Sequence, residues 1–589
     1  MLPIRQIPVS ITGQTWCWRG DRAGLDGDQS LIPDDLITQL ILARGCAREE
    51  VDAHRAPTIR HFLPDPSMFR DMDAAARRLA DAIGAHERVT VYGDYDVDGA
   101  TSAALLIRLL RALGLEADYY IPDRLMEGYG PSGEALVRLA GAGTSLIVTV
   151  DCGAQAFEAL EMASAAGVDV IVVDHHKCAS ELPRAFALVN PNRLDESADA
   201  AAHGHLAAVG VAFLLGAALV RELRARGFFD GRPEPRLIDL LDLVALGTVA
   251  DVAQLRGLNR AFVAQGLKVM ARGENIGLAA LARASRLTRA PLCHDLGFAL
   301  GPRINAGGRV GKSDLGVRLL TTTDEEEARS LSAELDRLNE ERRAIEAMVQ
   351  EQAERLAQTQ ANRAVVLVSG EGWHPGVIGI VAGRLKEKLG RPTIVVAADG
   401  TGIGKGSGRS IAGVDLGAAV LAAKDSGFLI AGGGHAMAAG LTVAMATADA
   451  FHAFLDERLG SQIGAARAER RLALDALLSP RGVNPDLVTK LEEAGPYGVG
   501  WPAPRIATGP LRVIKADIVG SGHVRLILSG SDGASLKAIA FRQGDTALGQ
   551  ELLASPRDRA LWFAGRAKID EWSGGRSAEL HVDDAAWAG

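Results

Sequence analysis

Short apolar runs alternate with stretches of helical periodicity between residues 88 and 190. Runs rich in β-branched residues occupy 89–92, 146–150 and 170–173, and apolar positions recur at helical spacing over 102–113 and 154–166. Strands that alternate with helices in this way are typical of βαβ units and a parallel sheet. We therefore predict an α/β domain in this region.

The segments on either side of this pattern have helical periodicity. Residues 1–85 combine several helical patterns, and further helices are predicted over 206–226 and 236–290. The stretch 206–220 is apolar and free of charged residues. It is shorter than the ~20 residues that a membrane-spanning helix needs, so we expect a buried helix there.

A longer helix is predicted from Thr323, with Glu326 three residues later completing a capping box. Its apolar positions repeat every three or four residues, as the side of a helix that packs against other elements does. They are Leu331, Leu335, Leu338, Ile345, Val349 and Leu356. A coiled-coil partner site would give the same pattern, but we favour a solvated helix that connects two domains.

A second α/β pattern follows this helix. Residues 365–368 and 393–396 are predicted as strands, and 379–389 as a helix. Two segments rich in glycine, 402–408 and 432–434, are predicted as loops. Between residues 363 and 425, eight Lys or Arg stand against five Asp or Glu, so this part of the chain is locally basic.

The last part of the chain, from about residue 465, begins with helical segments and continues with short strands of alternating polarity. Gly and Asp turns separate these strands, which are predicted over 511–519, 524–528, 536–541 and 560–569. Several short strands with regular turns are typical of a small barrel, and we expect one of the OB type.

The composition is that of a globular protein. The 589 residues are 48% hydrophobic and 23% charged, which argues against general disorder. Five scattered cysteines without a CxxC pair argue against disulfides and structural zinc. No signal peptide is apparent, and we expect a soluble, cytoplasmic protein. The net charge of −9 disfavours a nucleic-acid partner only if the acidic residues are evenly spread.

The acidic residues are in fact concentrated after the apolar segments. The run 89–92 leads into Asp94, Asp96 and Asp98, and the segments ending at 150, 173 and 249 lead into Asp151, Asp174-His175-His176 and Asp251. Ligands of open α/β sheets bind beyond the carboxyl ends of the strands, so these side chains are expected at one edge.

Carboxylates that converge in this way repel one another unless a cation lies between them. Carboxylate oxygens with one or two imidazoles suit Mn²⁺ or Mg²⁺ better than zinc. Two ions about 3.5–4 Å apart could then activate water and hold a phosphoryl oxygen. A role as helix N-caps is the alternative for each Asp taken alone.

Candidate phosphate ligands lie among small residues elsewhere. Arg303, Asn305 and Arg309 lie in the glycine-rich segment 297–311, which we interpret as a loop that approaches phosphate closely, although its arginines could instead form surface or interdomain salt bridges. Ser407, Gly408, Arg409 and Ser410 offer hydroxyl, amide and guanidinium donors in a second predicted loop. Trp373 is either a base-stacking residue or a core residue.

The ordered motifs resemble those of a known superfamily. GDYDVDGAT, VDCG, DHH and GTVADV, which begin at residues 93, 150, 174 and 247, resemble the DHH phosphoesterase superfamily. GFALGPRINAGGRVG (297–311), EGWHPGVIGIVAGRL (371–385), GSGRS (406–410) and GGGHAMAAG (432–440) resemble its RecJ family, the single-strand-specific 5′→3′ exonucleases. The resemblance covers residues 50–589, although GWPAP (500–504) departs from the usual GNPEP.

The resemblance implies the fold and its domains. The expected fold class is a multidomain α/β protein with a parallel-sheet DHH domain, a long connecting helix, a smaller α/β domain of the DHHA1 type and an OB-like β-barrel. The expected boundaries are a helical region over 1–85, the DHH catalytic domain over 86–322, the connecting helix over 323–360, the DHHA1-type substrate-binding domain over 361–460 and the nucleic-acid-binding barrel over 461–589.

The resemblance also implies the site. Mn²⁺ or Mg²⁺, as two ions, would be held by Asp96, Asp98, Asp151, His175 and Asp251. Asp94 and His176 would be catalytic, with Asp174 fixing the geometry of the motif, although His176 could instead orient a metal ligand. Substrate would be bound by Arg124, Arg303, Asn305, Arg309, Ser407, Arg409 and His435.

The implied function is hydrolysis of single-stranded DNA from its 5′ end to 5′-mononucleotides, in recombination and repair. Implied partners are a single-strand-binding protein and recombination or mismatch-repair helicases. One alternative is a DHH phosphodiesterase that acts on short oligonucleotides or cyclic dinucleotides. Another is a catalytically inactive DNA-binding scaffold of the same fold.

Overall fold

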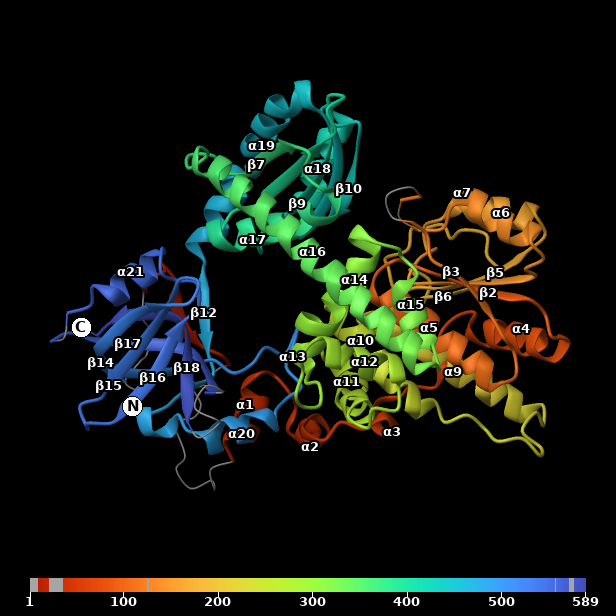
Figure 1. Ribbon diagram of the computed structural model, residues 1–589, viewed down its shortest axis with the longest axis horizontal. Helices are drawn as coiled ribbons and strands as arrows, with labels where there is room; N and C mark the ends of the chain where they lie inside the picture. The colour runs from red at the N-terminus through yellow and green to blue at the C-terminus, as the bar shows by residue number, and fades with distance from the viewer. Residues whose placement is uncertain are drawn as a thin grey trace. The chain divides into compact units, whose positions relative to one another are not determined.

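The computed structural model (Figure 1) describes residues 9–20, 35–123, 127, 128, 130–556, 558–570 and 577–588, without the side chains of 467 and 468. The chain divides into two compact units. One is built mainly from Asn339–Ala473, and the other mainly from Trp18–Leu338 and Leu474–Asp584.

The larger unit contains the predicted parallel sheet. Its order is β3-β2-β4-β5-β6, and every neighbouring pair is parallel. The strands are β2 (Val89–Gly93), β3 (Asp118–Tyr120), β4 (Leu146–Val150), β5 (Asp169–Val173) and β6 (Ala187–Val189). Strands β2 and β4 are buried along their whole length, because helices cover both faces of the sheet.

The helices on the two faces come from different parts of the chain. Helices α6 (Gly133–Gly141) and α7 (Phe157–Ala165) lie on one face, and α4 (Met72–Ala85), α5 (Val97–Ala112) and α9 (Ala208–Ala225) on the other (Figure 1). The apolar stretch after residue 206 is thus a buried helix, as predicted. Among the described residues, no helix is long and apolar enough to span a bilayer.

The N-terminal region is not purely helical. Helices α1 (Leu36–Ala43), α2 (Val51–Arg55) and α3 (Ile59–Phe62) precede α4. A strand that the sequence pattern did not predict, β1 (Thr15–Trp18), pairs with β12 (Arg471–Leu474). Because β1 is stabilised by pairing with a strand that is distant in the sequence, the local sequence pattern does not predict it.

Two segments near the sheet are helical, and one of them differs from its prediction. Residues 243–249 lie in helix α10 (Leu241–Ala250), within the region predicted as helices, so Asp251 follows a helix. The segment 297–311 is not a loop but a π-helical turn (Leu296–Leu300) that continues into α14 (Gly301–Val310). The other helices here are α8 (Ala198–Ala201), α11 (Gly257–Met270), α12 (Ile276–Ala284), α13 (Cys293–Asp295) and α15 (Leu315–Thr321).

The long helix α16 spans Glu325–Gln358, and the boundary between the two units falls within it, after Leu338. Its first turn is capped by Asp324, whose Oδ1 accepts hydrogen bonds from the amides of Glu326 and Glu327. The predicted start at Thr323 was therefore wrong. So was the last apolar position, because Leu356 is exposed and Ala357 is buried in its place.

The smaller unit contains a mixed sheet of order β10-β11-β9-β8-β7. The strands are β7 (Val366–Glu371), β8 (Thr393–Ala398), β9 (Ile403–Arg409), β10 (Ala431–His435) and β11 (Ala438–Ala444). Helix α17 (Pro375–Leu389) packs with α16 in one core, and α18 (Leu416–Asp425) and α19 (Ala448–Ala468) lie in another. The glycine-rich segments predicted as loops are strands β9 and β10.

The packing around β9 explains this difference. Gly404, Gly406 and Gly408 point toward the core that contains α18, where a Cβ would lie 2.4 to 2.7 Å from the side chains of Val396, Leu441 and Leu416. The residues that alternate with these glycines, Lys405, Ser407 and Arg409, therefore face the other side of the sheet.

The C-terminal barrel is confirmed. Its strands are β14 (Ile506–Val519), β15 (His523–Ser529), β16 (Ser535–Ala540), β17 (Ala560–Ile569) and β18 (Ala578–Trp587), and pairing of β14 with β17 closes it. Strand β13 (Ala476–Leu477) and the helices α20 (Pro485–Glu492) and α21 (Ala547–Leu553) accompany it. Strand β18 was not predicted.

Candidate metal centre

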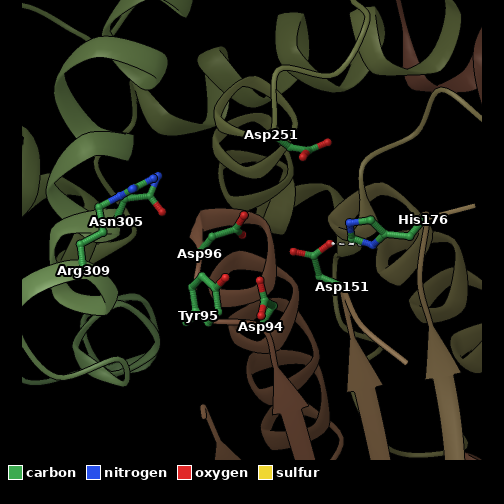
Figure 2. A pocket seen from close by; sticks show the side chains of 8 residues that line it. All are labelled: Asp94, Tyr95, Asp96, Asp151, His176, Asp251, Asn305 and Arg309. Carbon is green, nitrogen blue, oxygen red and sulfur yellow. Dashed lines mark ion pairs between the residues drawn. The ribbon is translucent and has the colours of Figure 1, made fainter. Parts of the chain in front are cut away.

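Acidic side chains from three segments surround one small cavity (Figure 2). Asp94, Asp96 and Asp98 follow β2, and Asp151 follows β4 in a left-handed conformation with a φ of 61°. Asp251 ends helix α10. The cavity has a volume of about 170 Å³ and is lined by Asp94, Tyr95, Asp96, Asp151, His176, Asp251, Asn305 and Arg309.

Two of these carboxylates also cap helices. Asp96 Oδ1 accepts hydrogen bonds from the amides of Asp98 and Gly99 at the start of α5. The two carboxylate oxygens of Asp98 accept from the amides of Ala208 and Val209, at 2.6 and 2.9 Å, in the first turn of α9. The alternative role as N-caps is thus correct for Asp96, and the same bonds hold both carboxylates in place.

His175 faces the carboxylates with an unprotonated nitrogen. Its Nδ1 lies 3.0 Å from the carbonyl oxygen of Leu206, which accepts a hydrogen bond, so Nε2 carries the lone pair. Nε2 is 3.3 Å from Asp151 Oδ1 and 3.9 Å from Asp98 Oδ2, and it has no hydrogen-bond partner among the described residues. A buried lone pair beside carboxylate oxygens is the arrangement that a cation would stabilise.

The raised pKa values of the clustered carboxyl groups also indicate a site for a cation. Burial, and the nearby charges of Asp251 and Asp96, raise the pKa of Asp98. Burial and the charges of Asp98, Asp96 and Asp94 raise the pKa of Asp151. Burial and Asp96 raise the pKa of Asp251 to about 7, against the opposing charge of His176. The ionised carboxylates therefore repel one another in the absence of a positive charge.

The ligand atoms are close enough to hold more than one cation. Three sets of potential ligand atoms each lie within 4.8 Å of one another: Asp94, Asp96 and Asp151; Asp98, His175 and Asp251; and Asp151, His175 and His176. Oxygen ligands with a minority of imidazoles suit Mn²⁺ or Mg²⁺. The residues present thus fit a divalent-metal site.

Asp174 and His176 form a buried pair beside the cluster. Asp174 Oδ1 lies 2.7 Å from His176 Nδ1 and also accepts from the amides of His175 and His176, while Oδ2 accepts from Ala154. Despite burial, these hydrogen bonds and the histidine charges lower the pKa of Asp174 to about 2. Burial lowers the pKa of His176, but the bond to Asp174 and its charge dominate and raise it to about 9.

The predicted phosphate ligands of segment 297–311 lie on helix α14 and separate into two groups. Asn305 and Arg309 line the cavity (Figure 2). Arg303 does not line it, because its Nε is 2.8 Å from Asp336 Oδ1 on α16 and its Nη1 donates to the carbonyl oxygen of Ala299. Arg124 lies outside the described residues.

The predicted ligands of the smaller unit lie together on one sheet. Ser407 and Arg409 are two residues apart on β9, and Arg409 Nη1 donates to Ser407 Oγ at 3.0 Å. Ala438 pairs with Arg409 on one side and with His435 on the other, which puts Arg409 and His435 in one row. His435 is exposed, and Arg409 and Ser407 are half-buried.

Both tryptophans that the sequence singled out are structural. Trp373 is buried in the core between α16 and α17, with Nε1 donating to Gln352 Oε1, so it does not stack on a base. Trp501 is also buried, with its ring 4.0 Å from that of His54. Arg260 lies over the same ring and donates to the carbonyl oxygens of residues 494–496, which fastens this segment to helix α11.

Sequence reasoning missed several residues near the site. Tyr95 lines the cavity between two acidic residues, and its place within the D-x-D-x-D motif could have indicated this. Asn192 was also missed, although its Nδ2 donates to the backbone oxygen of His175 at 2.6 Å. It lies beyond β6, and nothing in the local pattern relates it to the acidic motifs.

Comparison with known proteins agrees with the fold. The chain matches the DHH family, N-terminal domain, over residues 88–248, the DHHA1 domain over 360–461, and the RecJ OB domain over 474–584. The single-stranded-DNA-specific exonuclease RecJ of Dickeya dadantii is 38% identical over 94% of this chain and 96% of its own. RecJ of Escherichia coli is 37% identical over 93% of this chain and 95% of its own.

Solved structures of RecJ proteins are also similar to this chain. The crystal structure of RecJ in complex with Mn²⁺ from Thermus thermophilus has a TM-score of 0.72 and 31% identity, over 94% of this chain and 78% of that one. The Mg²⁺ complex from the same organism has a TM-score of 0.67 and 30% identity, over 95% and 78% of the two chains. Relatives of this identity and coverage establish the family, and the chain belongs to the RecJ family.

Proposed function

We propose that this chain is a metal-dependent exonuclease that degrades single-stranded DNA from the 5′ end and releases 5′-mononucleotides. The observation that carries the proposal is the convergence of Asp94, Asp96, Asp98, Asp151, His175 and Asp251 into sets of potential ligand atoms that lie within 4.8 Å of one another. Its relatives in the same family are named as single-stranded-DNA-specific exonucleases. Hydrolysis of a phosphodiester is the reaction that such a cluster suits best.

In this proposal Asp96, Asp98, Asp151, His175 and Asp251 hold two Mn²⁺ or Mg²⁺ ions. When bound, these ions supply Lewis acidity toward a phosphoryl oxygen and lower the pKa of water. The protein holds the ligands rigid: amides of α5 and α9 fix two carboxylates, and Leu206 fixes His175. Preformed ligands need no rearrangement during the reaction.

His176 and Asp94 act on the substrate in this proposal. Asp174 fixes the ring of His176 through Nδ1, so that Nε2 is the atom available to the reacting phosphate. The raised pKa of His176, about 9, keeps it protonated near neutral pH, which suits a donor to a phosphate oxygen or to the leaving 3′ oxygen. Asp94 lies buried on the floor of the cavity.

The 5′ polarity rests on the phosphate ligands. Ser407, Arg409 and His435 offer donors for a terminal phosphate, and Arg309 with Asn305 offers donors beside the metal site. Arg124 and Arg303 complete the proposed set, although Arg303 reaches substrate only if its pair with Asp336 opens. A dianionic terminal phosphate bound by guanidinium groups would fix one end of the strand.

The alternative of a phosphodiesterase for short oligonucleotides or cyclic dinucleotides is less favoured. The barrel and the match to the RecJ OB domain support a longer strand as substrate. A single-strand-binding protein and recombination or mismatch-repair helicases, in the cytoplasm, remain part of the proposal as partners. They rest on the family resemblance.

A direct experiment compares 3′-labelled single-stranded DNA, a matched blunt duplex and a dinucleotide as substrates with Mn²⁺, Mg²⁺ or EDTA. We expect stepwise shortening of the single strand from its 5′ end with either metal, little hydrolysis of the duplex and none with EDTA. Equal preference for the dinucleotide would overturn the proposal in favour of the alternative.

A further inference from the structure

Two asparagines that follow strand β6, Asn190 and Asn192, hold the turn that carries both histidines of the site. Strands β5 and β6 are parallel neighbours, and the amide of Asp174, after β5, donates to the last carbonyl oxygen of β6. The segments that follow the two strands therefore lie side by side. His175 and His176 lie outside helices and strands, so their carbonyl oxygens need partners other than those of a sheet.

The two asparagine side chains hold different histidines. Nδ2 of Asn190 donates to the carbonyl oxygen of His176 at 2.8 Å. Nδ2 of Asn192 donates to the carbonyl oxygen of His175 at 2.6 Å. Asn190 is completely buried, and its Oδ1 accepts from the amide of Asn192 at 2.8 Å. A side-chain amide that uses its donor and its acceptor in this way has one fixed orientation.

Asn192 also orients the ring of His175. Its Nδ2 makes a second hydrogen bond, to the carbonyl oxygen of Gly204 at 3.0 Å. Two residues further along the chain, the carbonyl oxygen of Leu206 accepts from Nδ1 of His175. Asn192 thereby ties the backbone of His175 to the segment that orients its imidazole. The direction of Nε2 toward the clustered carboxylates depends on both of these connections.

We propose that Asn190 and Asn192 are positioning residues with separate roles. Asn192 acts through His175 and sets the affinity for the metal ions. Asn190 acts through His176 and sets the rate of hydrolysis once the ions are bound. The inference rests on the proposed function, in which His175 is a metal ligand and His176 acts on the substrate. Loss of an outer partner of this kind typically costs about 10- to 100-fold in metal affinity or activity.

Calorimetric titration with Mn²⁺, in the absence of DNA, tests the role of Asn192. We expect Asn192→Ala to raise the Kd for Mn²⁺ about tenfold, and Asn190→Ala to leave it within about twofold of the wild type. Gly204→Ala perturbs the same contact from its other side, because a Cβ there would lie 2.4 Å from Oδ1 of Asn192, and it should also raise the Kd. An unchanged Kd in Asn192→Ala, or an equal rise in Asn190→Ala, would overturn the proposal.

Digestion of single-stranded DNA separates the two roles. At saturating Mn²⁺, Asn192→Ala should recover most of the wild-type kcat, whereas Asn190→Ala should remain about 10- to 100-fold slower. Asn484→Ala is the matched control, because Oδ1 of Asn484 accepts from the amide of Leu487 at 2.9 Å and caps helix α20. Loss of this cap should lower the unfolding temperature without changing the Kd for Mn²⁺ or kcat.

Two kinetic outcomes would contradict the separation of roles. One is recovery of Asn190→Ala by added Mn²⁺, and the other is a kcat of Asn190→Ala equal to that of Asn484→Ala. Failure of the wild-type protein to hydrolyse DNA would instead refute the proposed function, and the titration with Mn²⁺ would still report on the role of Asn192.

Discussion

Nδ1 of His176 lies 2.7 Å from Oδ1 of Asp174, and both side chains belong to the turn that follows β5. Backbone amides hold this carboxylate as well, because they donate to both of its oxygens. Asp174 therefore fixes the orientation of the His176 imidazole.

This arrangement predicts a separation between catalysis and metal binding. His176→Ala should lower kcat about 10²- to 10⁴-fold, as loss of a general acid does. Mn²⁺ affinity should change little, because five other residues hold the ions in our proposal. Calorimetric titration with Mn²⁺ and single-strand digestion measure the two effects. His61→Ala, at an exposed histidine, is the control, and a parallel loss of metal affinity in His176→Ala would assign His176 to the metal site.

Because the carboxylates repel one another, removing the charge of Asp151 should stabilise the metal-free protein and weaken its binding of Mn²⁺. Asp151→Asn removes a buried negative charge, and Asn tolerates the left-handed backbone, so the metal-free protein should gain about 1 kcal/mol of stability. Thermal unfolding in EDTA measures this gain. Mn²⁺ should raise the unfolding temperature of the wild type and much less that of the variant. A variant that is less stable than the wild type in EDTA would contradict the repulsion.

Gly379 on α17 leaves room for the proposed phosphate ligands. A Cβ at this position would lie 3.0 Å from Nη2 of Arg409 and 3.0 Å from Oγ of Ser407. Gly379→Ala should therefore displace both groups and reduce the preference for 5′-phosphorylated over 5′-hydroxyl substrates.

A matched control lies one turn along the same helix. A Cβ at Gly383 would meet nothing within 4 Å, so Gly383→Ala should add helix stability, about 1 kcal/mol, without affecting substrate preference. Equal kinetics of the two variants would show that Ser407 and Arg409 do not bind the terminal phosphate.

His54 predicts a pH dependence of stability away from the metal centre. Burial, with the charges of Arg260 and Arg44, lowers its pKa from 6.5 to about 3. The unfolded chain then binds more protons than the folded one between these pH values, so stability is lost as the pH falls through this window. Thermal unfolding from pH 7 to pH 4 should show a smaller loss in His54→Gln than in the wild type. The same loss in both would contradict the assignment, and the exposed His61→Gln serves as the control.

The sequence predicted the parallel sheet and the barrel well, because their strands are apolar runs with clear ends. The strands at 146–150 and 560–569 have the predicted bounds. The acidic motifs were also located correctly, since the carboxyl ends of parallel strands meet at one edge. Asp251 reaches the same edge from the end of helix α10, which the rule for strands does not cover.

The glycine-rich segments were misjudged for a physical reason. Glycine weakens strands and helices in isolation, so 402–408 and 297–311 were predicted as loops. In the folded protein the glycines of β9 face a crowded core, and the second segment is helical and packs beside the metal centre. The pairing of Arg303 with Asp336 depends in the same way on a distant partner, which local spacing does not reveal.

We propose that the cluster around Asp151 makes this protein a 5′→3′ exonuclease of single-stranded DNA. The most direct measurement is digestion of 3′-labelled single-stranded DNA with Mn²⁺, by the wild type and by Asp151→Asn. We expect a ladder that shortens from the 5′ end with the wild type, and no ladder with the variant or with EDTA. Undiminished degradation by Asp151→Asn, or shortening from the 3′ end, would contradict it.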